Sequence, residues 1–366
     1  MATDLLKKMA SVSASSIKNV ETLENSRTFN IKDTIRTGVP IINAAFSGDI
    51  MGGFTTGLTV LAGESKTFKT MMSLYCLKAY QDQYPESVCL FYDCEYGVTP
   101  QYLKSFGIDS SRILHIPVKH VEELKFDMVK RLEEISMGDK VFVLIDSIGA
   151  MASKKEVEDA VDQKSVADMS RAKAIRSLLR VITPYLTQKN LPCFMINHVM
   201  KEIGSMYPKT VIPGGTAVEY NSNSIFVITK AQEKTGTDVT GYKFTINIHK
   251  SRFVKEKSQF PFKVDMTSGI NQWSGLLDMA LESGHVVKPN MGWYAKVDTE
   301  TGEMIEGKYR AKDTENYEFW TSILKSKSFR QWVKNRYQYG AEVQFDKMLN
   351  LEWAENLDEM GERNDV

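Results

Sequence analysis

The segment from Leu58 to Thr70 constrains the fold and function of this chain more than any other part of its sequence. Residues 58–62 read as a buried strand, and a helix is predicted to begin near Lys69. Gly63, Lys69 and Thr70 keep the spacing of the phosphate-binding motif G-x-x-x-x-G-K-[ST]. The backbone amides of such a loop, at a helix N-terminus, bind phosphate groups. Lys69 would reach the β- and γ-phosphates, and the Thr70 hydroxyl would bind Mg²⁺.

The loop departs from the motif at one position, where Phe68 stands in place of the second glycine. A left-handed backbone there would cost a non-glycine residue roughly 1–2 kcal/mol. An ordinary strand–turn–helix with a chance Lys-Thr therefore stays open as an alternative. The residues predicted to contact the nucleotide here are Gly63, Glu64, Ser65, Lys66, Thr67, Phe68, Lys69 and Thr70.

Strands and helices alternate through the first 250 residues, which predicts an α/β fold with a mostly parallel sheet covered on both faces. In such sheets, ligands bind beyond the carboxyl ends of the strands. Polar pairs are expected to meet at this edge: Asp93 and Glu95, Asp146 and Ser147, Asn197 and His198, and Lys250 and Arg252. Buried strands have no structural need for such residues at one edge, so the phosphate-loop hypothesis gains support.

Two carboxylates at this edge suggest metal binding and catalysis. Asp146 follows four apolar strand residues, as in the Walker B arrangement, and would orient Mg²⁺ through a water molecule. Glu95 could orient and deprotonate an attacking water. The alternatives are a strand-end Asp that caps a loop and a solvated loop acid.

Composition limits the partners of the chain. Its 46 Lys and Arg residues balance its 46 Asp and Glu residues, so a nucleic-acid site must be a local patch. No apolar run approaches the ~18 residues of a membrane-spanning helix. The four cysteines lack metal-ligand spacing and are interpreted as reduced thiols in a cytoplasmic setting.

The pattern of predicted elements changes near residue 272. A helix is expected from Trp273 to Lys288, and one or two helices over residues 317–339, in a small α/β lobe with its own aromatic core. The predicted division is an N-terminal helix and linker for subunit contact (1–30), a core (31–272), the lobe (273–345) and an acidic tail (346–366).

The ordered set of motifs resembles the RecA family of recombinases, and most closely the UvsX recombinases of T4-type phages. The resemblance covers about residues 35–345. Its motifs are Phe91-Tyr92-Asp93-Cys94-Glu95 with Pro100-x-Tyr102, Leu144-Ile145-Asp146-Ser147, Ile196-Asn197-His198, Gly214-Gly215 and Lys250-x-Arg252.

The resemblance implies roles for further residues. Tyr102 would stack on the adenine of ATP. His198 stands where the family has a Gln that senses the γ-phosphate, although a buried structural histidine is the alternative. Lys250 and Arg252 would reach the ATP of a neighbouring subunit, because the hairpin expected over residues 230–248, if it lies at the margin of the sheet, turns the end of their strand away from the chain's own phosphate loop.

Two segments that follow strands at the catalytic edge of the sheet, Ser153–Ser170 and Val199–Pro213, correspond to the DNA-binding loops of that family. Their sparse cations fit binding through phosphates with little reading of bases. The residues expected to contact DNA are Arg171, Lys201, Lys209, Gly214 and Gly215. A basic face formed by Lys325, Lys327, Arg330, Lys334 and Arg336 is either an auxiliary duplex-DNA site or solvated surface.

The resemblance implies a DNA-dependent ATPase, with ATP and Mg²⁺, that forms head-to-tail helical filaments on single-stranded DNA and exchanges strands with a homologous duplex. A recombination mediator and a single-strand binding protein are expected partners, in the cytoplasm of a host cell, without a membrane role. The alternatives are an ATP-binding filament mediator with weak hydrolysis and a ring helicase on the same core.

Overall fold

The computed structural model describes residues 2–12, 20–26, 34–162, 170–201, 210–235, 238–265, 267–298, 301–305 and 307–340. The predicted acidic tail, Lys209 and the side chain of Lys201 lie outside these residues, as does most of the second loop. Among the described helices, none is both long enough and apolar enough to cross a bilayer.

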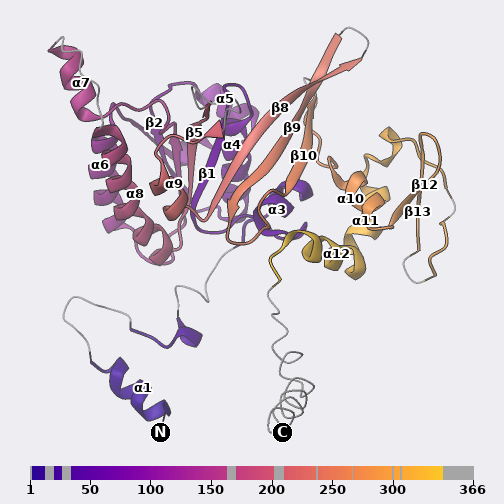
Figure 1. Cartoon of the computed structure of the whole chain (residues 1–366), viewed down its shortest axis with the longest axis horizontal. Helices are drawn as coiled ribbons and strands as arrows, with labels where there is room; N and C mark the ends of the chain where they lie inside the picture. Colours follow the sequence, from indigo (N-terminus) through magenta and orange to yellow (C-terminus); the bar gives the residue numbers. More distant parts are fainter. Residues whose placement is uncertain are drawn as a thin grey trace, which may run out of the picture.

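A mixed sheet of nine strands forms the centre of the described molecule, in the order β11-β10-β9-β8-β1-β5-β4-β2-β3 (Figure 1). The strands from β8 to β3 are parallel, and β9, β10 and β11 add antiparallel strands at one side. The predicted, mostly parallel α/β fold is thus confirmed. The strands are β1 (Gly57–Gly63), β2 (Val88–Asp93), β3 (Ile113–Pro117), β4 (Val141–Asp146), β5 (Pro192–His198), β8 (Ser224–Thr235), β9 (Asp238–Ser251), β10 (Gln259–Asp265) and β11 (Gly269–Ile270).

Helices cover both faces of the sheet because the central strands are apolar on both faces. Leu61 of β1 joins one buried cluster with helices α3 (Pro40–Ser47) and α4 (Lys69–Gln83). Its neighbour Val60 joins the other cluster, with α6 (Val121–Glu134) and α8 (Ser170–Gln188). Figure 1 shows α6 and α8 on one side of the strands and α4 on the other.

The C-terminal part differs from its prediction in two respects. The helix expected from Trp273 to Lys288 is only α10 (Leu276–Glu282), because Gly284 has a φ of 77° and strand β12 (Val286–Asn290) follows. Its aromatic side chains also do not form a separate core, since Phe319 and Trp320 belong to the buried cluster of α3 and α4. Strand β13 (Trp293–Lys296) and helices α11 (Tyr317–Lys325) and α12 (Lys327–Tyr337) complete the lobe, with two helices where one or two were expected.

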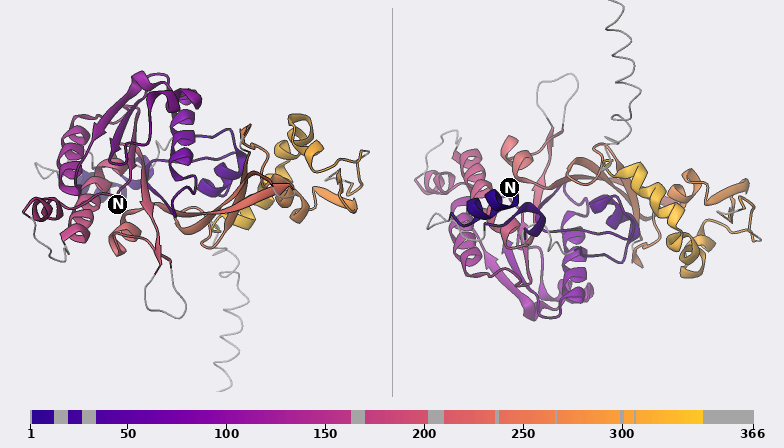
Figure 2. Two further views of the ribbon diagram at one scale, coloured as in Figure 1. Left: turned by 90° about the horizontal axis from the view of Figure 1, so that it is seen from above. Right: turned by 90° about the horizontal axis from the view of Figure 1, so that it is seen from below.

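The remaining elements are smaller and lie around the sheet and its covering helices. In both views of Figure 2, the C-terminal lobe lies at one end and α7 (Lys154–Val161) at the other. The N-terminal helix α1 (Ala2–Ala10) leaves Leu5, Leu6 and Met9 exposed. Helix α5 (Pro100–Ser105) follows β2, and the short helix α9 (Thr216–Asn221) precedes β8.

Candidate active site

The phosphate loop lies between β1 and α4, as predicted. A Cβ on Gly63 would lie 2.5 Å from Thr67 Oγ1 and 2.6 Å from the carbonyl oxygen of Ile228, so only glycine fits there. The loop borders a cavity of about 150 Å³. The cavity is lined by Ser65, Lys66, Thr67, Phe68, Lys69, Thr70, Met71, Glu95, Tyr102, Ile196 and His198. Three separate elements of the sheet edge therefore face one another across a single site.

Phe68 has the left-handed conformation that its side chain disfavours, with φ 71° and ψ 11°. Its ring is 5% exposed and contacts the rings of Tyr75, Phe244 and Phe262 at centroid distances of 6.0, 5.1 and 5.3 Å. Burial of a Phe side chain contributes about 1.5–3 kcal/mol, and each aromatic pair adds about 0.5–1.5 kcal/mol. This packing offsets a backbone strain of roughly 1–2 kcal/mol.

Lys69 is buried at the start of α4 and points back into the loop. Its Nζ donates to the carbonyl oxygen of Glu64 at 2.6 Å and lies 3.4 Å from Thr67 Oγ1. Burial lowers the pKa of Lys69, while the carboxylates of Glu95 and Asp146 act in the opposite direction. A phosphate group would stabilise this buried cation, as the motif predicts.

Asp146 has one oxygen available for a further ligand. The Thr70 hydroxyl donates to its Oδ2 at 2.9 Å, whereas its buried Oδ1 has no hydrogen-bond partner within the described chain. Burial, and then the Glu95 carboxylate, raises the pKa of Asp146 to about 7. A divalent cation would restore the ionised form. The unpaired oxygen beside a hydroxyl thus fits Mg²⁺, which needs only one or two protein ligands besides substrate phosphates and water.

Glu95 is held beside the cavity by neighbours at the carboxyl ends of three strands. The Ser147 hydroxyl donates to its Oε1, and His198 Nε2 lies 3.2 Å from the same oxygen. Asp93 Oδ1 accepts the backbone N–H of Glu95 at 3.0 Å. The predicted meeting of Glu95, Asp146 and His198 is confirmed. Sequence reasoning placed Ser147 at this edge but gave it no role, because its contact with Glu95 joins two different strands.

Tyr102 lies where a base could stack. Its half-buried ring lines the cavity and packs edge-on against Phe106 at a centroid distance of 5.1 Å. Thr99 caps α5 by accepting the backbone N–H of Tyr102 at 3.2 Å. The position of the ring is therefore set by the first turn of a short helix.

The expectation that Lys250 and Arg252 share the edge of the phosphate loop is wrong. Strand β9 is antiparallel to β8, and Lys250 pairs with Ile225 near the start of that strand. The carboxyl end of β9 consequently lies at the opposite edge of the sheet from Gly63. These two cations cannot serve the phosphate loop of their own subunit.

The second loop is closed at its base, although residues 202–209 are outside the described structure. Strands β6 (Met200–Lys201) and β7 (Thr210–Val211) pair, and Asn197 Nδ2 donates to the Pro213 carbonyl oxygen at 2.8 Å. Gly215, with φ 62° and ψ −155°, has a conformation open essentially only to glycine. Gly214 also has a positive φ, of 100°. The paired glycines thus set the turn from the loop into α9.

Arg171 lies at the first loop, but its guanidinium is already engaged. Its Nε donates to the carbonyl oxygen of Met151 at 2.7 Å, and Nη2 donates to those of Ile148 and Gly149 at 3.1 and 2.8 Å. These bonds fix the segment after Asp146. Arg171 therefore supports the root of the loop in this structure.

The basic face predicted over residues 325–336 is smaller than its sequence suggests, and its first cation, Lys325, belongs to α11 rather than to α12. Lys334 pairs with Asp49 at 3.1 Å, and Arg336 lies 3.7 Å from Glu282. Both acids come from elements far away in the sequence, so the helix alone could not reveal them. This pairing leaves Lys325 and Lys327 as the more available cations.

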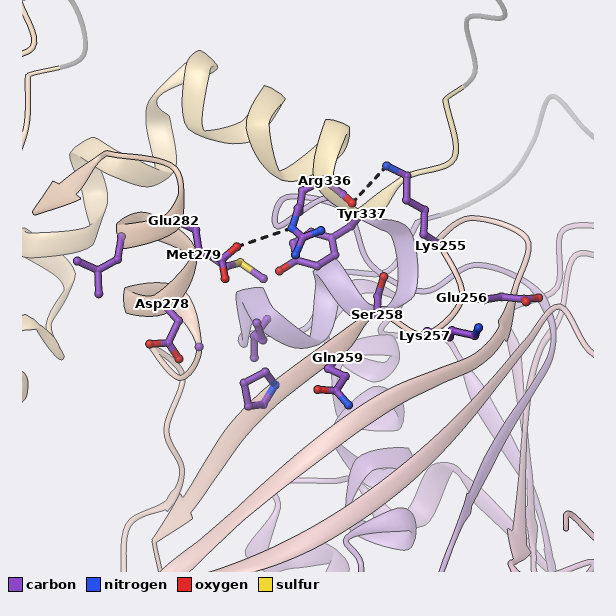
Figure 3. Close-up of a pocket in the computed structure, with 14 residues that line it drawn as sticks. Lys255, Glu256, Lys257, Ser258, Gln259, Asp278, Met279, Glu282, Arg336 and Tyr337 are labelled. Atoms are coloured by element: carbon purple, nitrogen blue, oxygen red, sulfur yellow. Dashed lines mark hydrogen bonds and ion pairs between the residues drawn. The ribbon is translucent and has the colours of Figure 1, made fainter. Parts of the chain in front are cut away.

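A larger cavity, of about 730 Å³, lies away from the phosphate loop, between the β9–β10 turn and helices α10 and α12 (Figure 3). Its charged lining consists of Lys255, Glu256, Lys257, Asp278, Glu282 and Arg336. Three cations are balanced by three acids, and Lys255 Nζ also donates to the Asn335 carbonyl oxygen at 2.7 Å. The cavity consequently lacks the preference for anions that the phosphate loop has.

Comparison with known proteins places these features in a family. The chain matches the family described as "RecA N-terminal domain" over residues 12–271. Over residues 273–333 it matches "Bacteriophage T4, Recombination and repair protein, C-terminal domain".

Individual relatives agree with these matches. The recombination and repair protein of Enterobacteria phage T4 is 49% identical over 350 residues, covering 93% of this chain and 89% of that protein. Protein RecA of Corynebacterium urealyticum is 29% identical, with 75% of this chain and 74% of that protein covered. Protein RecA of Paracoccus denitrificans is 25% identical, with 69% of this chain and 70% of that protein covered.

Proposed function

The chain belongs to the RecA family of recombinases, and from this premise we propose that it is a DNA-dependent ATPase that polymerises on single-stranded DNA. The family assignment supports a RecA-like core and a role in recombination and repair. The observation that carries the proposal is that Lys69 and Glu95 line one cavity, while Asp146 accepts a hydrogen bond from Thr70 of the same lining. We also propose the division into core and lobe near residue 272.

In the proposed reaction, the loop amides and Lys69 bind the phosphates of ATP, and Tyr102 stacks on the adenine. Thr70, and Asp146 through a water molecule, would hold Mg²⁺, which would neutralise charge at the phosphates. Glu95 orients a water molecule and takes its proton as the water attacks the γ-phosphorus, and ADP leaves. His198 is the last residue of β5, directly before the second loop, and its Nε2 lies 3.2 Å from Glu95 Oε1. It would therefore couple the presence of the γ-phosphate to the conformation of that loop.

DNA is the proposed polymeric substrate. The segments after β4 and β5, with Arg171, Lys201, Lys209, Gly214 and Gly215, would contact single-stranded DNA, and a homologous duplex would pair within the filament. Subunits would join head to tail, and a recombination mediator and a single-strand binding protein would assist assembly. Family membership supports these partners, and the described ends of both segments follow β4 and β5, the strands that end in Asp146 and His198.

Replacement of Lys69 by alanine tests the nucleotide site. We expect the affinity for ADP to fall by about a hundredfold, because a charged hydrogen-bond partner of the phosphates is lost. Isothermal titration calorimetry with ADP and Mg²⁺ measures the change. The matched control is Lys78→Ala on the same helix, where the side chain forms a surface pair with Asp82. Equal affinities of the wild-type and Lys69→Ala proteins would contradict the proposal.

DNA affinity is expected to fall steeply with salt and to vary little with sequence, because backbone phosphates are the proposed contacts. Each phosphate neutralised on a single strand gives a log–log slope of about −0.7. Fluorescence anisotropy at several salt concentrations, with oligonucleotides of equal length and different sequence, measures both properties. A flat salt response, or a strong preference for one sequence, would be the contrary result.

A further inference from the structure

We propose that Phe68 is a positioning residue whose ring, rather than the freedom of a glycine, holds the phosphate loop in the left-handed conformation from which α4 begins. The inference rests on the proposed nucleotide site and concerns how that site is kept ready for its ligand. Glycine adopts a positive φ without strain, whereas Phe68, at φ 71°, does not.

The ring of Phe68 is fixed by two residues far away in the sequence and by one on helix α4. The rings of Phe244 of β9 and Phe262 of β10 lie 5.1 and 5.3 Å from it, and they stack on each other at a centroid distance of 5.5 Å. Tyr75, two turns along α4, stacks on it at an interplanar angle of 23°. A loop held in this way is ordered by the antiparallel strands and by its own helix, before a nucleotide binds.

The same contacts continue to the opposite wall of the cavity. Tyr75 packs edge-on against Phe106 at 5.4 Å, and Phe106 packs against Tyr102 at 5.1 Å. Phe68 and Tyr102 both line the cavity, one beside the phosphate loop and one where the base is proposed to stack. This row of rings therefore sets the distance between the two ends of the nucleotide site.

The proposal predicts an unusual order of ADP affinities among three variants of Phe68. In Phe68→Ala the ring is gone but the Cβ still disfavours a positive φ, so the competent loop becomes a minor state. We expect the Kd for ADP to rise about tenfold. Phe68→Gly also loses the ring, but glycine populates both conformations, so the Kd should rise only about threefold. Phe68→Tyr keeps the ring and should bind like the wild type.

If the side chain of Phe68 had a purely structural role, Phe68→Gly would bind ADP no better than Phe68→Ala, because glycine removes at least as much packing as alanine. Thermal unfolding measures this loss separately from ADP titration. The matched control is Phe46→Leu in α3, a residue that is 3% exposed and packs against Phe54 and Phe226. It should lower the melting temperature and leave the Kd for ADP unchanged.

If Phe68→Ala does not fold, Tyr75→Leu tests the same packing from outside the loop, because it removes the ring that stacks on Phe68. This variant should raise the Kd for ADP by about two- to tenfold. Glycine and alanine variants that bind ADP equally, or alanine binding better, would overturn the inference. So would an unchanged Kd in Tyr75→Leu. If Lys69→Ala loses binding as expected while these variants behave alike, only the role of Phe68 fails. A wild-type protein that does not bind ADP would instead remove the proposed function itself.

Discussion

An Arg252→Ala protein is expected to lose DNA-stimulated ATP hydrolysis by about 10³- to 10⁵-fold while it still binds ATP. Arg252 is exposed, and among the described residues its side chain has no hydrogen bond or ion pair. It lies at the opposite edge of the sheet from its own phosphate loop. In a head-to-tail polymer, that edge can meet the ATP site of the next subunit, where a cation would stabilise charge in the transition state.

Mixing two inactive proteins measures this contribution between subunits. Lys69→Ala supplies an intact Arg252, and Arg252→Ala supplies an intact phosphate loop, so interfaces of one orientation contain a complete site. ATPase activity should return on mixing in the presence of single-stranded DNA. Lys308→Ala, an exposed cation on the C-terminal lobe, serves as the control and should be fully active alone. Co-assembly without recovery of activity would rule out the assignment.

Arg252 is a cleaner probe than Lys250, to which the same role is proposed. Lys250 Nζ donates to the carbonyl oxygen of Ser222 at 2.9 Å and to that of Glu219, at the end of α9. Burial, and then Arg252, lowers the pKa of Lys250. Its truncation would disturb a helix that follows the second loop, so a loss of activity would have two causes.

A Glu95→Gln protein is expected to bind ATP normally and to hydrolyse it about 10²- to 10⁴-fold more slowly, because the amide cannot accept the proton of the attacking water. Glutamine has nearly the same shape and can still accept a hydrogen bond from Ser147. Phosphate release under saturating ATP and DNA gives the rate, and calorimetry gives the affinity.

The matched control for this prediction is Glu86→Gln, an exposed acid in the turn before β2. It removes the same charge from the surface and should leave turnover unchanged. Turnover of Glu95→Gln within a few fold of the wild type would exclude Glu95 as the base. A parallel loss of ATP affinity would assign it to binding instead.

Local patterns predicted the elements that form the site, because each depends on a short segment. The strand before Gly63, the helix from Lys69 and the strand that ends in Asp146 were all readable from apolar runs and their boundaries. Their meeting at one edge followed from the parallel arrangement of the sheet.

The errors came from features that depend on distant residues. A hairpin before β9 predicts its antiparallel direction, whereas the grouping of Lys250 with the strand ends at the phosphate loop treats the strand as parallel, and that grouping is wrong. The left-handed turn at Phe68 is stabilised by Phe244, which lies more than 170 residues later in the chain. The omission of helix α3 has a local cause instead, because the glycine-rich run over residues 36–57 does not predict a helix, although Pro40 starts α3 in the way typical of a first helical turn.

The closed base of the second loop has a consequence for engineering. Because β6 and β7 pair and Asn197 bonds to Pro213, the chain leaves and re-enters the body at nearly one point. Doubling the length of a flexible loop between fixed ends costs only about 0.6 kcal/mol. A reporter peptide or a small tag inserted after residue 201 would therefore leave the folding of the core almost unaffected, and such a graft would stand beside the nucleotide site.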